Sequence, residues 1–455
     1  MRKFLCTVIA ALAFASAQAG GFQVVLQGVR QTSMGNTGTG IVDINNAFFN
    51  PGSVAFLEKS EISVGANFIF SSIAYNPANS PSDLYNSTSP ISTPFFLSAM
   101  FGVGAAGAEG TGKKLKVGLN VTTPFGSTVQ WDAGWAGQYS LTKLKLTAIY
   151  VQPTVAYQIT DKLGFGAGFD LILGGVELER SADIFGTVAD VKFTAPFKKP
   201  TEQAYSFNVG LFYKATDKFT VGLNYRHGAT IKVKGGDVKI SNVPALVGNN
   251  PLAFTPGLYN PATKEVNGHF DAALQIPHVG TVGFGYQANE NLLLTLDARV
   301  TAWETYTQLG FEFRNPDTGA PELISGAANS YSPRNYKTVF NVGAGVEHSI
   351  KDFRLRAGMY YDQSPVQNGY MTAETPDANT IGTTVGMGYK LGPMSLDLGF
   401  LYINKMTRVN GAPIKFNPLD GTVINTTQTT SNIVGPRGTF ETNAFIPSFA
   451  LSYKF

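Results

Sequence analysis

The last residues of the chain alternate between apolar side chains and small or polar ones. Successive side chains of a β-strand point to opposite faces, so an alternation with period two predicts a strand with one apolar face. The apolar face of this predicted strand holds Phe445, Pro447, Phe449, Leu451, Tyr453 and Phe455, and the other face holds Ile446, Ser448, Ala450, Ser452 and Lys454.

The same alternation recurs along the whole chain. It is clearest over residues 62–71, 115–122, 164–173, 205–214, 219–226, 292–301 and 353–360. The faces opposite the apolar ones carry mostly Gly, Ser, Thr and Asn, with few charges. A soluble β-sandwich would expose charged residues on its wet faces. The pattern therefore favours a transmembrane β-barrel, an all-β fold whose apolar faces contact lipid.

The connections between the predicted strands are alternately short and long. Short ones are expected near 106–112, 160–162, 215–218, 288–291, 350–352 and 391–394, and long ones near 75–90, 123–142, 181–202, 236–265, 303–336, 364–380 and 409–439. Bacterial barrels have short periplasmic turns and long outer loops. The alternation predicts 14 antiparallel strands with both ends on the periplasmic side, if 266–288 is one long strand that bends at Pro277.

The first 19 residues have the form of a secretory signal peptide. Arg2 and Lys3 precede an apolar run, and Ala17-Gln18-Ala19 is a small-x-small cleavage site. The run is too short for a membrane helix. The single cysteine, Cys6, lies inside this leader, so the predicted mature chain from Gly20 carries no disulfide and no thiol chemistry.

Composition agrees with an exported barrel and argues against other classes. Charged residues make up 14% of the chain, against about 25% in ordinary soluble domains. A net charge of +3 is too small to indicate nucleic-acid binding. The four histidines, His227, His269, His278 and His348, are not at metal-ligand spacing, so no metal or cofactor is expected. No set of nucleophile and base stands out, so no enzyme is predicted.

The stretch from Ala47 to Leu57 is apolar but does not fit the strand pattern. Pro51 removes a backbone donor, and Gly52 follows it, which makes a central strand or a helix interior a poor fit. About 40 residues precede the first predicted strand at Ile62. We interpret residues 20–59 as a lumenal plug that ends with this stretch, and residues 60–455 as the barrel.

Two further patterns have ordinary structural interpretations. Gly164, Gly166 and Gly168 share one strand face and lack a following helix, so they do not form a dinucleotide loop. Five charged residues occupy strand positions that the alternation assigns to the lumen. We expect them to form an ion network inside the barrel rather than a substrate site. They are Asp297, Arg299, Glu347, Arg354 and Arg356.

Several motifs, in order along the mature chain, give a resemblance to a known family. They are "GGFQ" with Gly21 and Phe22, "NNAFFNPGSVAFL" with Asn50 and Pro51, "PFGSTVQWDAGWAGQY" with Pro124, Phe125, Gly126, Trp135, Gly137 and Tyr139, "VELER" ending at Arg180, and "YYDQSPV" with Asp362, Ser364 and Pro365. From Gly20 to Phe455 the chain resembles the FadL family of outer-membrane transporters for long-chain fatty acids and other hydrophobic compounds. Gly52 stands where that family usually has Ala.

The resemblance implies a fold and a set of roles. The fold would be a 14-stranded barrel closed by an N-terminal hatch that includes Gly21, Phe22, Asn50, Pro51 and Gly52. Ligand would pass from an apolar groove in the outer loops to a lumenal pocket near the extreme N-terminus. It would then leave through an opening in the wall beside a kink in the third strand, at Pro124, Phe125 and Gly126. Arg180, which would end the fifth strand, falls where the family has a basic ligand contact.

The resemblance also implies location and partners. The protein would be a monomer in the outer membrane of a Gram-negative bacterium, in contact with lipid and lipopolysaccharide. The C-terminal strand ending in Phe455 resembles the assembly signal that outer-membrane proteins present to the barrel-assembly machinery. Its cargo would be hydrophobic small molecules, most of all long-chain fatty acids. An aqueous porin-like channel is the alternative, and an adhesin or an outer-membrane enzyme is a third class.

Overall fold

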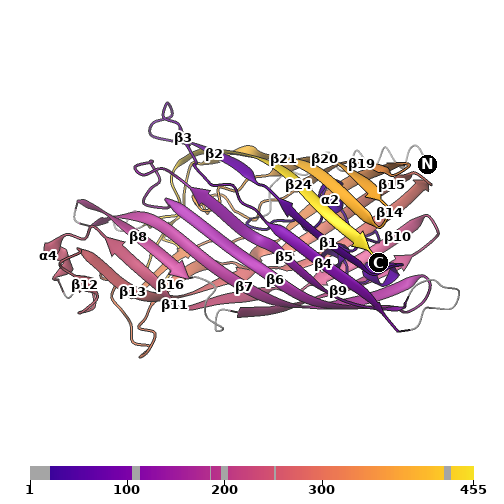
Figure 1. Ribbon diagram of the computed structural model, residues 1–455. Coiled ribbons are helices and arrows are strands. Elements are labelled where there is room, and N and C mark those ends of the chain that lie inside the picture. The colour runs from indigo at the N-terminus through magenta and orange to yellow at the C-terminus, as the bar shows by residue number, and fades with distance from the viewer. Residues whose placement is uncertain (1–20, 105–112, 185, 196–202, 251–252, 425–431) are drawn as a thin grey trace.

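Antiparallel strands make up most of the chain, and long strands run side by side at a common tilt (Figure 1). The computed structural model describes residues 21–104, 113–184, 186–195, 203–250, 253–424 and 432–455. The predicted signal peptide and the predicted turn at 106–112 lie outside these residues. No helix within the described ranges is long and apolar enough to cross a membrane.

Fourteen strands pair in a closed ring. Backbone pairing runs through β1, β4, β5, β6, β7, β9, β10, β14, β15, β18, β19, β20, β21 and β24, and β24 pairs back with β1. All of these pairs are antiparallel, so the fold class and the predicted number of strands are confirmed. The bounds are β1 Glu61–Asn67, β4 Phe95–Val103, β5 Leu115–Gln130, β6 Lys143–Gln158, β7 Leu163–Ile184, β9 Gln203–Lys214, β10 Phe219–Arg226, β14 His278–Asn289, β15 Leu292–Ala302, β18 Val339–Ile350, β19 Phe353–Asp362, β20 Thr380–Leu391, β21 Met394–Asn410 and β24 Gly438–Lys454.

Further strands extend the wall on the side of the long connections. They are β2 Phe70–Pro77, β3 Tyr85–Asn86, β8 Thr187–Ala195, β11 Ala229–Ser241, β12 Tyr259–Asn260, β13 Glu265–Ile276, β16 Gln308–Phe313 and β17 Asn329–Pro333, and a separate two-stranded sheet joins β22 Lys415–Phe416 to β23 Asn432–Ile433. The long connections also carry α4 Ala245–Gly248 and the 3-10 turn η5 Trp303–Thr305. α4 and β12 lie at the end of the molecule opposite the C-terminus (Figure 1).

The apolar strand faces point outward, as the alternation predicted. In β24, Phe445, Phe449 and Leu451 are exposed, whereas Ile446 and Ala450 are buried. Exposed apolar side chains recur around the ring at Phe101, Leu119, Val155, Phe165, Leu211, Leu223, Leu296, Leu355, Val385 and Leu398. In water such a surface would be costly, at about 25 cal/mol per Å² of apolar area. The band is therefore the lipid-facing surface of a transmembrane barrel.

Two predictions about strand ends need correction. Residues 176–180 do not end the fifth strand, because β7 continues to Ile184 and pairs with β8. Likewise, β5 runs to Gln130, inside the predicted loop 123–142. These extensions leave the lipid, so charged pairs replace apolar alternation, as where Lys192 Nζ contacts carboxylates of Glu177 at 2.7 Å and Glu179 at 2.8 Å. The long strand predicted over 266–288 is divided at Pro277 into β13 and β14, where only a bend was expected.

Residues 21–60 lie inside the ring, and we call them the lumenal segment. They carry short helical turns, α2 Val29–Thr32, α3 Asn46–Phe49 and η2 Ser53–Phe56. The backbone of Gly52 lies very close to that of Gly210 in β9. A Cβ at Gly52 would overlap β9, and a Cβ at Gly210 would overlap the lumenal segment. A Cβ at Gly222 of β10 would likewise overlap the carbonyl of Thr39. Glycine on the lumenal strand faces thus lets the lumenal segment contact the wall directly.

Candidate functional site

The turn at Asn50, Pro51 and Gly52 is tied to the wall by one buried amide. Asn50 Nδ2 donates to the carbonyl oxygens of Thr39 and Leu211, both at 2.9 Å, and Asn50 Oδ1 accepts the Gly52 N–H at 3.0 Å. Asn50 is fully buried. The apolar stretch from Ala47 to Leu57 thus lies against the inner wall, where Pro51 packs beside Gly166.

The start of the lumenal segment pairs with β5 at the residues where a kink was predicted. The register between β5 and β6 shifts between Thr122 and Phe125. At that point, Val24 N–H donates to the Pro124 carbonyl at 2.8 Å, and Gly126 N–H donates to the Phe22 carbonyl at 3.1 Å. The neighbouring strand β4 pairs with β5 only as far as Thr122. The lumenal segment therefore occupies the edge of β5 that β4 leaves free.

Phe22 stands in an aromatic cluster at this junction. Its ring centroid lies 4.7 Å from Trp303, 5.7 Å from Tyr306 and 6.1 Å from Phe125. The Gly21 N–H donates to Asp377 Oδ2 at 3.0 Å. Gly21 and Phe22 are therefore fixed at the N-terminal edge of the segment by one polar and several aromatic contacts.

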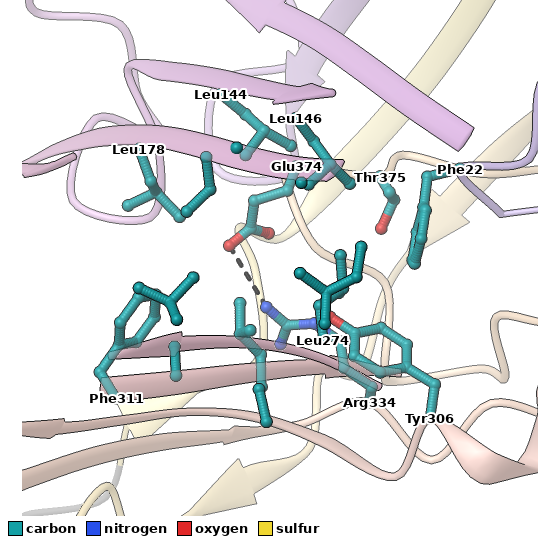
Figure 2. Close-up of a pocket in the computed structure, with 18 of the residues that line it drawn as sticks. Phe22, Leu144, Leu146, Leu178, Leu274, Tyr306, Phe311, Arg334, Glu374 and Thr375 are labelled. Atoms are coloured by element: carbon teal, nitrogen blue, oxygen red, sulfur yellow. Dashed lines mark hydrogen bonds and ion pairs between the residues drawn. The ribbon is translucent and has the colours of Figure 1, made fainter. Parts of the chain in front are cut away.

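Beside Phe22 lies an apolar cavity, which we call the inner pocket. Figure 2 shows Leu144, Leu146, Leu178, Leu274 and Phe311 converging on it. The space between its lining atoms, including the part that is open to solvent, is about 790 Å³, and apolar side chains form most of its lining. Most of its residues come from β6, β7, β11, β13 and β16, and the rest come from the lumenal segment and the long connections.

One ion pair lies at the edge of the inner pocket. Arg334 Nη2 lies 3.4 Å from Glu374 Oε1, and the side chain of Arg334 is almost fully buried (Figure 2). Burial alone would lower the pKa of the Arg334 guanidinium, but the Glu374 carboxylate outweighs it and the pKa is raised. The otherwise apolar cavity therefore has one end that carries a buried ion pair.

Arg180 lies in a second, more polar cavity, which we call the outer pocket. The residues that it shares with the inner pocket are Leu178, Leu309, Phe311, Arg334 and Glu374. The Arg180 guanidinium makes no hydrogen bond to the described residues, and its Nε is buried without a partner. Arg334 thus lines both cavities, and Arg180 lines only the outer pocket. Arg180 is attracted by the Glu374 carboxylate, which already pairs with Arg334, so two buried guanidinium groups share one carboxylate. This arrangement is suited to a further anionic group.

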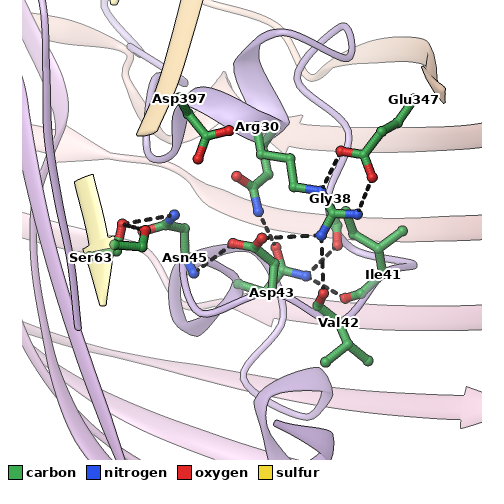
Figure 3. A network of polar contacts seen from close by, with 12 residues as sticks. Arg30, Gly38, Ile41, Val42, Asp43, Asn45, Ser63, Glu347 and Asp397 are labelled. Carbon is green, nitrogen blue, oxygen red and sulfur yellow. Dashed lines mark hydrogen bonds and ion pairs between the residues drawn. The ribbon is translucent and has the colours of Figure 1, made fainter. Parts of the chain in front are cut away.

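The lumenal ion network contains four of the five predicted residues in buried positions, and Arg354 is half-buried beside them. Glu347 accepts from Arg356 at 2.7 Å, and Asp297 Oδ2 accepts the Gly38 and Thr39 N–H groups at 2.9 Å. The network also includes Arg30 of the lumenal segment. Its guanidinium contacts Glu347 Oε1 at 2.8 Å and Asp43 Oδ2 at 3.2 Å (Figure 3). This network therefore holds the lumenal segment to the wall.

The sequence did not point to Arg30, Arg226, Arg334 or Trp303. Each acts through contacts with residues far away along the chain, as Arg226 does with Asp170 and the Phe48 carbonyl. Arg226 and Asp170 occupy strand positions that the alternation assigns to the lumen, so the sequence could have indicated that they face inward. Arg334 and Trp303 lay in predicted loops, where alternation gives no direction.

Taken together, the closed ring, the lipid-facing apolar band and the lumen filled by residues 21–60 define a class. The protein is a transmembrane β-barrel of the outer-membrane type whose lumen is occupied by its own N-terminal segment and contains an apolar pocket.

The family follows from comparison with known proteins. The model of a family described as "Outer membrane protein transport protein (OMPP1/FadL/TodX)" matches residues 10–455, and the chain belongs to this family. It is thus an outer-membrane transport protein and not an enzyme, and its family transports hydrophobic small molecules.

Individual relatives are distant in sequence and similar in fold. The long-chain fatty acid transport protein of Escherichia coli O6:H1 is 22% identical over 324 residues, which cover 67% of this chain and 68% of the relative. A FadL homologue from Pseudomonas aeruginosa has a TM-score of 0.75 at 18% identity, over 96% of this chain and 100% of that one. The toluene transporter TodX from P. putida has a TM-score of 0.66 at 14% identity, over 97% and 99%.

Proposed function

We propose that the protein takes up hydrophobic compounds, above all long-chain fatty acids, by passive movement from the outer loops through the inner pocket to an opening in the wall beside Pro124, Phe125 and Gly126. The observation that carries this proposal is the position of Phe22. It lines the inner pocket and contacts Phe125 at the bulge of β5. Phe22 and its neighbours thus separate an apolar cavity from an irregular edge of the wall.

The physical chemistry suits an apolar chain with a carboxylate at one end. Burial of the chain contributes roughly 0.8 kcal/mol per CH₂ group, so the inner pocket needs few polar contacts. Arg180 and Arg334 would receive the carboxylate at the polar end. We assign residues 21–60 the role of a hatch, with Asn50, Pro51 and Gly52 as its fixed end and Gly21 and Phe22 as the part that moves. Exit into the membrane would spare the chain a passage through water.

A disulfide lock tests whether the hatch must move. Gln23 and Phe125 face each other in an antiparallel bridge, a spacing that suits a disulfide, and the only native cysteine is Cys6 of the predicted leader. We expect the Gln23→Cys/Phe125→Cys variant, when oxidised, to lose about tenfold or more of its radiolabelled oleate uptake in cells that lack their own transporter. Oleate binding to the purified protein should persist.

The same variant under reducing conditions and the two single variants are the controls. Because reduction releases the lock without changing the sequence, uptake should return. Equal uptake in the oxidised and reduced forms would rule out movement of residues 22–24 as part of the route.

A second experiment tests Arg180 as the carboxylate contact. A hydrogen bond to a charged group is worth about 1.5–3 kcal/mol, so Arg180→Gln should weaken oleate binding roughly 10- to 100-fold. Binding of oleyl alcohol should change little. Arg314→Gln, which alters a half-exposed arginine paired with Glu312, is the matched control. An equal loss for acid and alcohol would show that Arg180 supports the pocket and does not bind the carboxylate.

A further inference from the structure

The barrel wall has a second irregularity, far from β5. His278 pairs with Ala302, and Ala272 pairs with Phe311. Between these pairs, residues 273–277 face residues 303–310, five against eight, and no backbone hydrogen bond joins the two stretches. We call this gap in the pairing the side window.

The sequence explains why the strands separate here. Pro277 has no N–H to donate across the wall. On the other side, the chain leaves the strand path in η5, where Trp303 and Tyr306 turn into the lumen and pack on Phe22. Both are buried. The excess residues are therefore drawn inward, away from β13.

Cavities lie on both faces of the side window. The inner pocket lies on the lumenal face, and a groove on the other face is lined by Lys232, Lys234, Asp271, Gln275, Gln308 and Glu312; we call it the side groove. Val233, Ala272 and Ala273 line both cavities. Ala273 is exposed, and Gly310 lies across from it, so small side chains form the partition.

The side window lies just beyond the lipid-facing band. Exposed Tyr225 and half-buried His227 and His278 form an aromatic group at the last regular pair before the window, with the Tyr225 hydroxyl 2.9 Å from His278 Nδ1. Such groups mark the edge of the hydrocarbon layer. The side groove therefore opens at the level of lipid headgroups.

The side groove is lined by two lysines and two carboxylates, and the carboxylates already accept hydrogen bonds. Asp271 accepts the Gly235 N–H at 2.8 Å, and Glu312 accepts from Arg314 and Tyr331. Lys232 and Lys234 are exposed and form no ion pair with the described residues. The two free ammonium groups thus lie at the outer mouth of an opening whose inner side is apolar.

We propose that the side window is a second mouth of the inner pocket, through which a long-chain carboxylate passes between the headgroup layer of the outer leaflet and the pocket. The chain crosses between Ala273 and Gly310, and the carboxylate is met by Lys232 and Lys234. This inference rests on the proposed function, because it takes the same pocket as the binding site. It adds a sideways route to the one through the outer loops.

The first test blocks the window. In a background in which Trp131 and Trp135 are replaced by Phe, quenching of Trp303 by dibromostearate reports binding in lipid nanodiscs, since Trp303 contacts Phe22 of the inner pocket. A blocked route raises a barrier that association and dissociation share, so Ala273→Phe should slow both rates by about tenfold and change Kd by much less than either rate. Ala298→Phe, on the outer face of β15, is the matched control.

The second test changes only the charge. Lys232→Gln/Lys234→Gln should slow binding of the carboxylate about tenfold at low ionic strength, and 0.5 M salt should remove the difference. Oleyl alcohol should compete for the pocket equally well in wild type and variant. Lys218→Gln, in a periplasmic turn, is the control.

The outcomes separate the two proposals. If wild type does not bind dibromostearate, the proposed fatty-acid function fails. If wild type binds it and both Ala273→Phe and the lysine variant bind at the wild-type rate, the side window is overturned and the proposed function stands.

Discussion

Deletion of residues 20–47 should convert a nearly closed barrel into an open pore, with single-channel conductance rising on the order of tenfold or more in planar bilayers. The truncated chain should still fold and insert, because the deleted segment supplies no wall strand. Among the described residues 21–47, the only regular backbone pairing with the wall is the short bridge between Gln23 and Phe125. The ring closes instead through β1 and β24, which pair from Glu61 to Asn67.

The groups that the deletion uncovers can be satisfied by water. Asp297 loses the N–H groups of Gly38 and Thr39, and Glu347 loses Arg30, but Glu347 keeps Arg356. A wet lumen hydrates these charges, as in porins. The deletion should therefore open the lumen and remove Phe22 from the lining of the inner pocket, while the barrel itself stays folded.

A deletion of residues 315–320 is the matched control, since it shortens an outer hairpin and leaves the lumenal segment intact. A truncation that cannot fold would contradict the interpretation of residues 21–60 as a plug. Large, steady conductance in the wild-type protein would support an aqueous channel in its place.

The fold could be predicted because lipid imposes a simple code on each strand. Phe449 and Ala450, or Leu211 and Phe212, alternate between lipid and lumen, and glycine or proline clusters mark the connections. This alternation of apolar and small or polar residues is lost where the strands extend beyond the membrane. Beyond it, Glu177 and Lys192 face water and pair with each other, so β7 and β8 resembled a loop.

The site was only partly predictable, for a related reason. Asn50 and Pro51 lie in a segment that the pattern rejects as a strand, so a separate role was visible. Arg334 lies in a predicted loop, and nothing local shows that it will meet Glu374 beside Leu178. Such pairings depend on strand register and loop packing across the lumen, and alternation alone does not fix either.

Replacement of Arg226 by Met should cost about 3–5 kcal/mol in the free energy that holds the lumenal segment in place. Arg226 Nη1 pairs with Asp170 Oδ2 at 2.5 Å, and both side chains are buried. Its Nη2 donates to the Phe48 carbonyl at 3.0 Å, and its guanidinium lies 4.3 Å from the centre of the Phe48 ring. The variant leaves an unpaired carboxylate inside the lumen and frees the end of α3.

The loss should appear as faster hydrogen exchange over residues 46–50 and as brief channel openings, with little change in exchange of the wall strands. Asp170→Asn/Arg226→Met removes both charges and should recover most of the loss, because the main cost is the isolated carboxylate. Arg314→Met is the control for loss of a half-exposed arginine. If hydrogen exchange over residues 46–50 is as fast in the double variant as in the single one, the contacts with Phe48, and not the ion pair, hold the segment at this point.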